Sequence, residues 1–268
     1  MNIGLFDSGL GGLIVTHSLI QAMPEYNYVY LGDTARVPYG NRSQATIYEF
    51  TKSGVEYLFE QGCHLVILAC NTASAEALRK LQTEYLPQHY PDRRILGVLV
   101  PAAEEVVTTT KKRKVGVIAT QGTVSSEAYI RQIQRLDSSV EVFQQATPLL
   151  VPLVENNALK YADPILDDYL APLVKQGIDT LVLGCTHYPL FKTLIRSKVG
   201  DTVRVLSQDE YIPIKLTEYL ARHPDIDQRL SKDGTYQFFV TDNAPSTASV
   251  ARYLFGESVN LQKVTLNS

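Results

Sequence analysis

Two cysteines stand at the ends of two similar apolar segments, and their side chains are the best candidates for chemistry in this chain. The segments read QGCHLVILACNT at 61–72 and QGIDTLVLGCTH at 176–187. Matching residues, such as Cys70 and Cys185, keep a constant spacing of 115 residues. This constant spacing indicates a duplicated supersecondary unit, with one cysteine delivered by each copy.

Each cysteine is predicted to lie at the carboxyl end of a buried strand. The apolar runs 65–69 and 181–183 are typical of strands buried on both faces, and 73–81 has helical spacing. In open parallel sheets this edge forms the ligand crevice, and a helix that begins there points its N–H groups and positive dipole end at the thiol. We therefore expect the thiol pKa values of Cys70 and Cys185 to fall from about 8.5 toward neutrality.

Strands and helices are expected to alternate along the chain, which predicts an α/β fold with mainly parallel sheets. Ser43 should cap a long helix that ends near Gly62, and Pro101 should mark the crossing into a second half. A chain of 268 residues with an internal repeat favours two domains of similar build. The expected strands are 3–6, 26–31, 65–69, 95–100, 114–119, 140–144, 181–183, 203–206 and 236–241.

Composition limits the classes of partner. The net charge of -3 gives no reason to expect a nucleic-acid surface, and no stretch reaches the roughly 18 apolar residues of a membrane span. Three cysteines are too few for a disulfide framework, which favours a reducing compartment and hence a cytoplasmic protein. A small molecule is the expected partner.

Other reactive residues have alternative interpretations. Asp7 and Ser8 follow the first strand, where they could hydrogen-bond a ligand ammonium, take a thiol proton or cap the next helix. The glycines of GLGG at 9–12 fit a tight turn better than a nucleotide site. Cys63 has no polar neighbours in sequence and is interpreted as a buried apolar residue.

His187 could be a zinc ligand together with Cys185, a buried core residue or a proton shuttle. The sequence contains no CxxC motif and no paired histidines, so no metal site is predicted. A hydrolase that uses one cysteine and one histidine would leave the matched cysteine unexplained.

A pair of opposed thiols suits a reaction whose two directions are mirror images, and racemisation is such a reaction. One thiolate removes the Cα proton from one face while the other thiol supplies a proton to the opposite face. Because an amino-acid Cα–H is a very weak acid, the site also needs desolvation and hydrogen-bond donors for the substrate carboxylate.

Four motifs together resemble glutamate racemase of the aspartate/glutamate racemase superfamily, and the resemblance spans nearly the whole chain. They are FDSGLGG at 6–12, PYG at 38–40, ACNTAS at 69–74 and GCTHYPL at 184–190. The resemblance implies a racemase that needs neither pyridoxal phosphate nor metal, with two pseudo-symmetric doubly wound domains and an active site in the cleft between them. We expect these domains to comprise 1–97 plus 208–268, with Cys70, and 98–207, with Cys185.

The resemblance also implies roles for individual residues. Cys70 would take the proton from D-glutamate with help from Asp7, and Cys185 would take it from L-glutamate with help from His187. The implied substrate-binding residues are Asp7, Ser8, Tyr39, Gly40, Asn71, Thr72, Thr120, Thr123, Glu155, Thr186 and His187. Such an enzyme would supply D-glutamate for peptidoglycan, and a homodimer is expected.

Two residues depart from the family pattern, and two other functions stay open. Val100 stands where the family often has an acid or histidine, and Thr147 stands where it often has cysteine. One alternative is a racemase of aspartate or another acidic amino acid, which the relative turnover of the two substrates would reveal. The other is an amino-acid-binding protein without catalysis, for which tight binding without turnover would argue.

Overall fold

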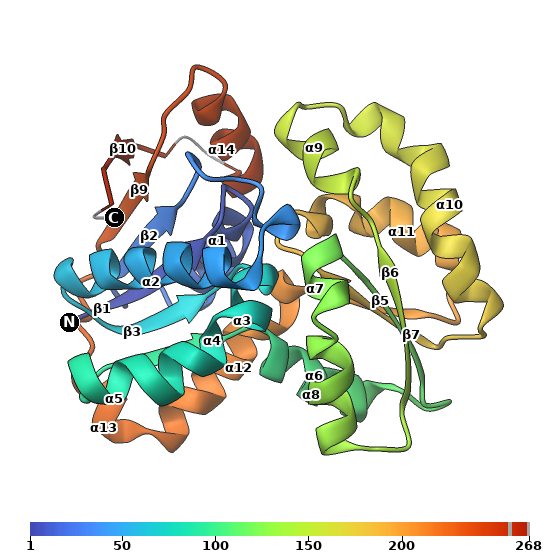
Figure 1. The fold of residues 1–268 in the computed structure, drawn as a ribbon, viewed down its shortest axis with the longest axis horizontal. Coiled ribbons are helices and arrows are strands. Elements are labelled where there is room, and N and C mark those ends of the chain that lie inside the picture. Colours follow the sequence, from blue (N-terminus) through green and yellow to red (C-terminus); the bar gives the residue numbers. More distant parts are fainter. Residues whose placement is uncertain (257–258, 267–268) are drawn as a thin grey trace.

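Two β-sheets, each made of parallel strands, lie side by side in the computed structural model, which describes residues 1–256 and 259–266 (Figure 1). The first sheet has the strand order β10-β9-β2-β1-β3-β4, and the second has the order β6-β5-β7-β8. We call the parts built on these sheets the first lobe and the second lobe. The strands of the first are β1 (Asn2–Asp7), β2 (Tyr28–Gly32), β3 (Cys63–Leu68), β4 (Arg94–Gly97), β9 (Tyr236–Val240) and β10 (Leu261–Lys263). Those of the second are β5 (Lys114–Ala119), β6 (Glu141–Ala146), β7 (Thr180–Gly184) and β8 (Arg204–Leu206).

The two sheets repeat one strand order, since β2-β1-β3-β4 in the first lobe corresponds to β6-β5-β7-β8 in the second. In both lobes the strand before the cysteine is a central one. Every strand pair is parallel, so all carboxyl ends within a sheet share one edge. The predicted α/β fold with parallel sheets is thus confirmed, and the spacing of the two cysteine segments reflects a real structural repeat.

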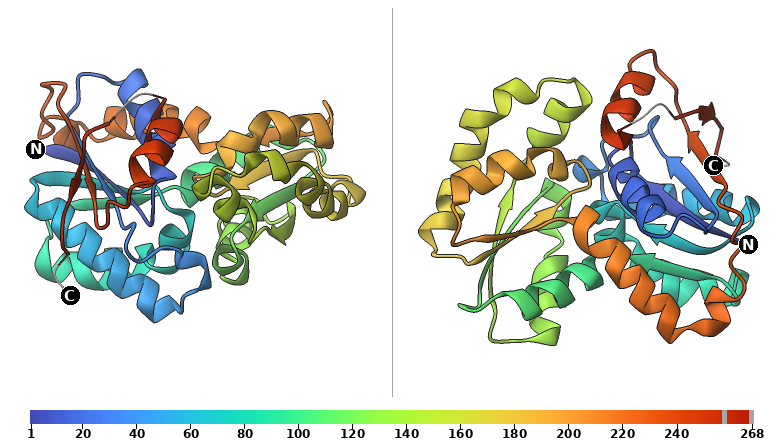
Figure 2. Two further views of the ribbon diagram at one scale, coloured as in Figure 1. Left: turned by 90° about the horizontal axis from the view of Figure 1, so that it is seen from above. Right: turned by 180° about the vertical axis from the view of Figure 1, so that it is seen from behind.

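Helices surround both sheets, and the C-terminal segment returns to the first lobe, as the further views in Figure 2 show. The helices around the first sheet are α1 (Gly12–Ala22), α2 (Gln44–Glu60), α3 (Asn71–Glu76), α4 (Leu78–Lys80), α5 (Leu86–His89), α12 (Gln208–Arg222), α13 (Pro224–Asp227) and α14 (Thr247–Phe255). Those around the second sheet are α6 (Leu99–Thr109), α7 (Gln121–Ser125), α8 (Ala128–Leu136), α9 (Leu150–Glu155), α10 (Ala162–Lys175) and α11 (Lys192–Val199). Shorter turns are the 3₁₀ helices at Tyr39–Asn41, Leu159–Tyr161 and Tyr188–Phe191 and the π-helical turn at Leu81–Tyr85.

Alternation along β1 explains why the first sheet is covered on both faces. Ile3 and Leu5 join one apolar core, whereas Phe6 joins a second core beneath α2. Each such fully buried side chain contributes about 1.5–3 kcal/mol relative to an exposed one. The core that holds Ile3 also includes Val117 of the second lobe, so one continuous apolar core joins the two lobes.

Most predicted elements are present, but the strand expected at 95–100 is too long. β4 ends at Gly97, and Leu99 begins α6, so Pro101 lies in the first turn of a helix. Proline is tolerated there because the N–H groups of a first turn have no partner within the helix. The chain therefore crosses to the second lobe through α6. The predicted cap is confirmed, since the Ser43 hydroxyl accepts a hydrogen bond from the N–H of Thr46.

None of the helices formed by the described residues is both long and apolar enough to cross a membrane.

Candidate active site

A cavity of about 220 Å³ lies between the carboxyl edges of the two sheets, and both matched cysteines line it. Cys70 follows β3 and Cys185 follows β7, so the structural repeat brings one thiol from each lobe to a single cavity. The cysteines are only 5% and 7% exposed. The predicted site residues that line the cavity are Ser8, Tyr39, Gly40, Cys70, Asn71, Thr72, Thr120, Glu155, Cys185, Thr186 and His187.

Cys70 caps the helix that carries the next two site residues. Its Sγ accepts a hydrogen bond from the N–H of Ala73 at 3.5 Å, which fixes the start of α3. The thiol in turn donates to the hydroxyl of Ser8, 3.2 Å away. Ser8 directly follows β1, so the end of one strand holds the thiol that follows the neighbouring strand.

The expectation of a low thiol pKa is wrong for Cys70. Burial, reinforced by the negative charge of Asp7, raises the pKa of the Cys70 thiol to about 12. The hydrogen bonds with Ser8 and Ala73 act in the opposite direction and are outweighed. One helix N-terminus cannot offset the loss of solvation of a thiolate in a buried site. Cys70 is therefore a neutral thiol in the free protein.

Cys185 has a cationic neighbour instead. Its Sγ lies 3.7 Å from Nδ1 of His187, and Nε2 of the same ring lies 3.4 Å from a carboxylate oxygen of Glu155. Burial lowers the pKa of His187, but the contacts with Cys185 and Glu155 outweigh it and raise that pKa to about 10. His187 is therefore an imidazolium at neutral pH, held between the sulfur of Cys185 and the carboxylate of Glu155.

Asp7 lies behind the cavity wall. It is fully buried, and its two carboxylate oxygens accept hydrogen bonds from the N–H of Gly9 at 3.0 Å and from the hydroxyl of Thr186 at 3.2 Å. Burial raises the pKa of Asp7, opposed by the charge of His187 and by these hydrogen bonds. Neither Asp7 nor Ser8 caps α1, because Gly11 occupies that position and forms no side-chain cap.

Three threonine hydroxyls meet where the two lobes face each other. The Thr72 hydroxyl lies 3.0 Å from that of Thr120 and 3.2 Å from that of Thr123, and the last two are 3.1 Å apart. Thr120 caps α7, so the cluster joins the N-terminal ends of α3 and α7. Thr72 and Thr120 line the cavity, whereas the fully buried Thr123 supports them from behind.

Sequence reasoning did not assign several lining residues to the site. Thr147, one of the two departures from the family pattern, lines the cavity, and its hydroxyl lies 2.5 Å from that of Tyr188. Val100, the other departure, does not line this cavity. The unassigned lining residues are Val37, Pro38, Asn41, Gln121, Thr147, Pro148, Val151, Pro152, Asn156 and Gly184.

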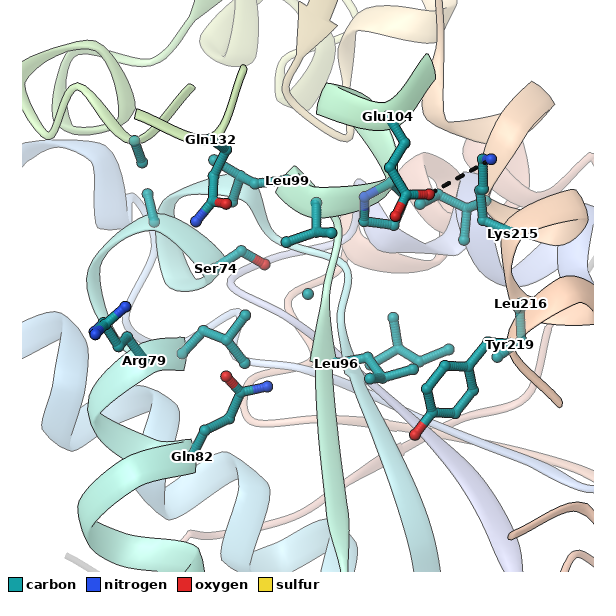
Figure 3. Close-up of a pocket in the computed structure, with 18 of the residues that line it drawn as sticks. Ser74, Arg79, Gln82, Leu96, Leu99, Glu104, Gln132, Lys215, Leu216 and Tyr219 are labelled. Carbon is teal, nitrogen blue, oxygen red and sulfur yellow. Dashed lines mark ion pairs between the residues drawn. The ribbon is translucent and has the colours of Figure 1, made fainter. Parts of the chain in front are cut away.

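A larger cavity, of about 590 Å³, lies behind α3 between β4, α6, α8 and α12 (Figure 3). Val100 and Ser74 line it, and Glu104 and Lys215 form an ion pair of 3.5 Å at its edge. None of the described residues around it carries a thiol, so it lacks the chemistry of the smaller cavity. Among residues 1–256 and 259–266 there is also no group of three or more His, Cys, Asp or Glu side chains that could hold a metal ion.

Comparison with known proteins identifies the family. The family model described as Asp/Glu/Hydantoin racemase matches residues 4–208. A glutamate racemase of Persephonella marina is 37% identical over 269 residues, covering 100% of this chain and 98% of the relative. The chain belongs to the glutamate racemase family.

Solved structures of glutamate racemases agree in fold over the full length of the chain. The structure of an isoform from Bacillus anthracis aligns with a TM-score of 0.90 and 35% identity, covering 99% of this chain and 97% of the other. That of the Francisella tularensis enzyme, in complex with D-glutamate, aligns with a TM-score of 0.88 and 30% identity, covering 99% and 98%.

The two thiols of this glutamate racemase family member have opposite electrostatic surroundings. Asp7 and burial favour the neutral form of Cys70, which suits a proton donor. Cys185 instead has the imidazolium of His187 beside it, with Nδ1 3.7 Å from its sulfur.

Proposed function

We propose that the protein interconverts L- and D-glutamate by two proton transfers that use Cys70 and Cys185. The observation that carries the proposal is that matched strands of two repeated sheets deliver these thiols to one cavity. In the direction from L- to D-glutamate, the Cys185 thiolate takes the Cα proton and the Cys70 thiol donates its proton to the opposite face. The substrate leaves as D-glutamate, with Cys70 now the thiolate and Cys185 the thiol. The reverse reaction exchanges these roles.

The charged neighbours assist the two transfers. His187 stabilises the thiolate of Cys185 before the proton is taken, and Glu155 holds the imidazole in its charged form. Asp7 favours the protonated form of Cys70 and therefore also makes its thiolate a stronger base in the reverse direction. Because both transfers use groups of this chain, the proposal includes no metal or cofactor.

Hydrogen-bond donors around the cavity would bind the substrate and stabilise the carbanion-like transition state. Thr72 and Thr120 offer hydroxyls, and Asn71 offers an amide. The hydroxyl hydrogen of Thr186 is donated to Asp7, so the Thr186 oxygen would instead accept from the substrate ammonium group. Thr123 and Asp7 would act from behind the wall, through Thr120 and Thr186. Ser8, Tyr39 and Gly40 complete the proposed binding set.

The assembly and location of the protein are also proposals. We propose that 1–97 plus 208–268 and 98–207 act as two domains that close over glutamate, which the two separate sheets support. A cytoplasmic location is supported by three free cysteines, and the D-glutamate would serve peptidoglycan synthesis. A homodimer is proposed from family membership, and light scattering after gel filtration tests it.

The decisive experiment follows L-glutamate by circular dichroism in deuterated buffer with a chelator and without pyridoxal phosphate, and then locates deuterium by mass spectrometry. Loss of optical signal with one deuterium at Cα supports the proposal. Cys70→Ser and Cys185→Ser should each abolish turnover because an alcohol is a far weaker acid than a thiol, while Cys63→Ser, outside the cavity, should not. Turnover by Cys70→Ser at the wild-type rate would overturn the mechanism, and turnover of aspartate alone would change the substrate.

A further inference from the structure

The side chain of Asn71 is held from two sides by residues that no motif singled out. Its Oδ1 accepts a hydrogen bond from the Tyr129 hydroxyl at 2.7 Å and another from Nε2 of Gln208 at 2.9 Å. Asn71 opens α3, Tyr129 lies in α8 and Gln208 opens α12, so three helices converge on one amide. All three side chains are at least 98% buried.

The hydrogen of the Tyr129 hydroxyl fixes which way the amide points. Tyr129 is fully buried, and within the described residues its hydroxyl has no acceptor besides Asn71. If the amide were turned over, its NH₂ would face the hydroxyl, and the phenol hydrogen would be left buried without an acceptor. Oδ1 therefore faces Tyr129 and Gln208, with both of its lone pairs used.

The other end of the amide is free for a ligand. Asn71 lines the catalytic cavity, and its Nδ2 is a buried atom with no hydrogen-bond partner among the described residues. A buried amide nitrogen without a partner is costly, and such groups often have a functional explanation. An NH₂ group donates and cannot accept, so it complements a carboxylate oxygen and repels an ammonium group.

We propose that Tyr129 and Gln208 are positioning residues that turn the Asn71 amide so that its NH₂ group binds a carboxylate of the substrate. The inference rests on the proposed function, since it assigns the ligand chemistry of one wall of that same cavity. Tyr129 and Gln208 do not line the cavity and act only through Asn71. Tyr129 belongs to the second lobe and Asn71 and Gln208 to the first, so one of the two hydrogen bonds that hold the amide crosses between the lobes.

The test combines single substitutions with double-mutant cycles. Tyr129→Phe and Gln208→Leu should each raise KM for L-glutamate about threefold to tenfold, the worth of one ordering hydrogen bond, and Asn71→Leu at least as much. In the Asn71→Leu background, Tyr129→Phe and Gln208→Leu should change KM by less than about twofold. A merely structural role would give the same further loss in both backgrounds, and that result would overturn the proposal.

A matched control separates orientation from the general cost of removing a buried hydroxyl. Tyr28 is also buried, and its hydroxyl donates to backbone oxygens of Leu19 and Met23, away from the cavity. Tyr28→Phe should leave KM unchanged.

Binding of glutarate, measured by calorimetry, supplies a readout without turnover, because glutarate keeps both carboxylates and lacks the ammonium group. If the wild type bound glutarate without racemising glutamate, the proposed function would fail, but the same double-mutant cycles, measured as changes in the Kd for glutarate, would still test Tyr129 and Gln208. Weakening of glutarate binding by Asn71→Leu supports a carboxylate contact, and unchanged binding overturns it.

Discussion

The hydroxyl of Thr186 donates a hydrogen bond to the buried carboxylate of Asp7 and so joins the loop after β7 in one lobe to the end of β1 in the other. Thr186 directly follows Cys185, and Asp7 adds its charge to the burial that raises the thiol pKa of Cys70. This one contact therefore connects the surroundings of both thiols across the cavity.

Removing the Thr186 hydroxyl should weaken this connection. In Thr186→Val the buried Asp7 carboxylate loses one of its donors, which costs about 1–3 kcal/mol of stability, and the KM for glutamate should rise. Urea unfolding and steady-state kinetics measure the two effects. Thr186→Ser keeps a hydroxyl and should restore most of both; a Thr186→Val protein as stable and active as the wild type would show that the contact is unimportant.

Gly11 allows the two lobes to approach each other closely. A Cβ atom built on Gly11 would lie 2.5 Å from Nδ1 of His187 and closer still to Oγ1 of Thr186. Gly11→Ala must therefore displace the buried side chains of Thr186 and His187, which flank Cys185 in the site, and a shift of about 1 Å can reduce kcat/KM about 100-fold. Gly9→Ala is the matched control, since its Cβ would meet the movable end of Glu155 at 3.3 Å and the side chain of Val37 at 3.4 Å, with Asp7 Oδ2 at 4.0 Å. Equal activity of the two variants would contradict this account.

The cysteine pair was predictable from sequence because the repeat and the strand ends are local patterns. Two apolar segments at constant spacing are enough to place Cys70 and Cys185 at equivalent sheet positions. The strand that pairs with β9 was not predicted, because β10 is a three-residue segment defined only by that pairing. The short helix α9, which ends at Glu155, was also missed, since six residues carry too little periodicity.

Contacts between distant segments could not be predicted from local patterns. The high thiol pKa of Cys70 follows from burial and from Asp7, and neither effect is visible in the sequence around Cys70. Gln208 lies 137 residues from Asn71, and no spacing rule joins them. Thr147 enters the cavity wall because β6 pairs with β5, a fact of the sheet topology.

Loss of the His187 charge should slow one of the two proton transfers more than the other. In His187→Gln the Cys185 thiolate loses its imidazolium, so proton removal from L-glutamate should slow, by about 10²- to 10⁴-fold if His187 acts fully in that step. Because the equilibrium constant of a racemisation is one, kcat/KM must fall equally in both directions. The asymmetry should appear in the deuterium isotope effect on kcat/KM. This isotope effect should be larger for Cα-deuterated L-glutamate than for Cα-deuterated D-glutamate. Equal isotope effects would exclude a specific role beside Cys185, and His17→Gln, outside the cavity, should change neither.

Cys63 should make the protein less stable in alkaline solution. Burial, opposed by the charge of Arg93, raises the pKa of this thiol to about 12, against an ordinary value of 9.0. Below pH 9 the thiol is protonated in both the folded and the unfolded state, so it contributes no pH dependence. Above pH 9 the unfolded chain releases the proton while the folded chain retains it, so the free energy of unfolding falls, by about 2 kcal/mol at pH 10.5.

Cys63→Ala removes this titration and should make the decline in stability between pH 9 and 10.5 shallower, whatever its effect on stability at pH 7. Urea unfolding of wild type and variant under reducing conditions measures the two slopes. Cys70→Ala should flatten the decline similarly, because burial and Asp7 also raise the pKa of Cys70 to about 12. If the free energy of unfolding fell equally with pH in the wild type and in Cys63→Ala, the Cys63 thiol would ionise as readily in the folded protein as in the unfolded chain. That result would contradict the raised thiol pKa of Cys63.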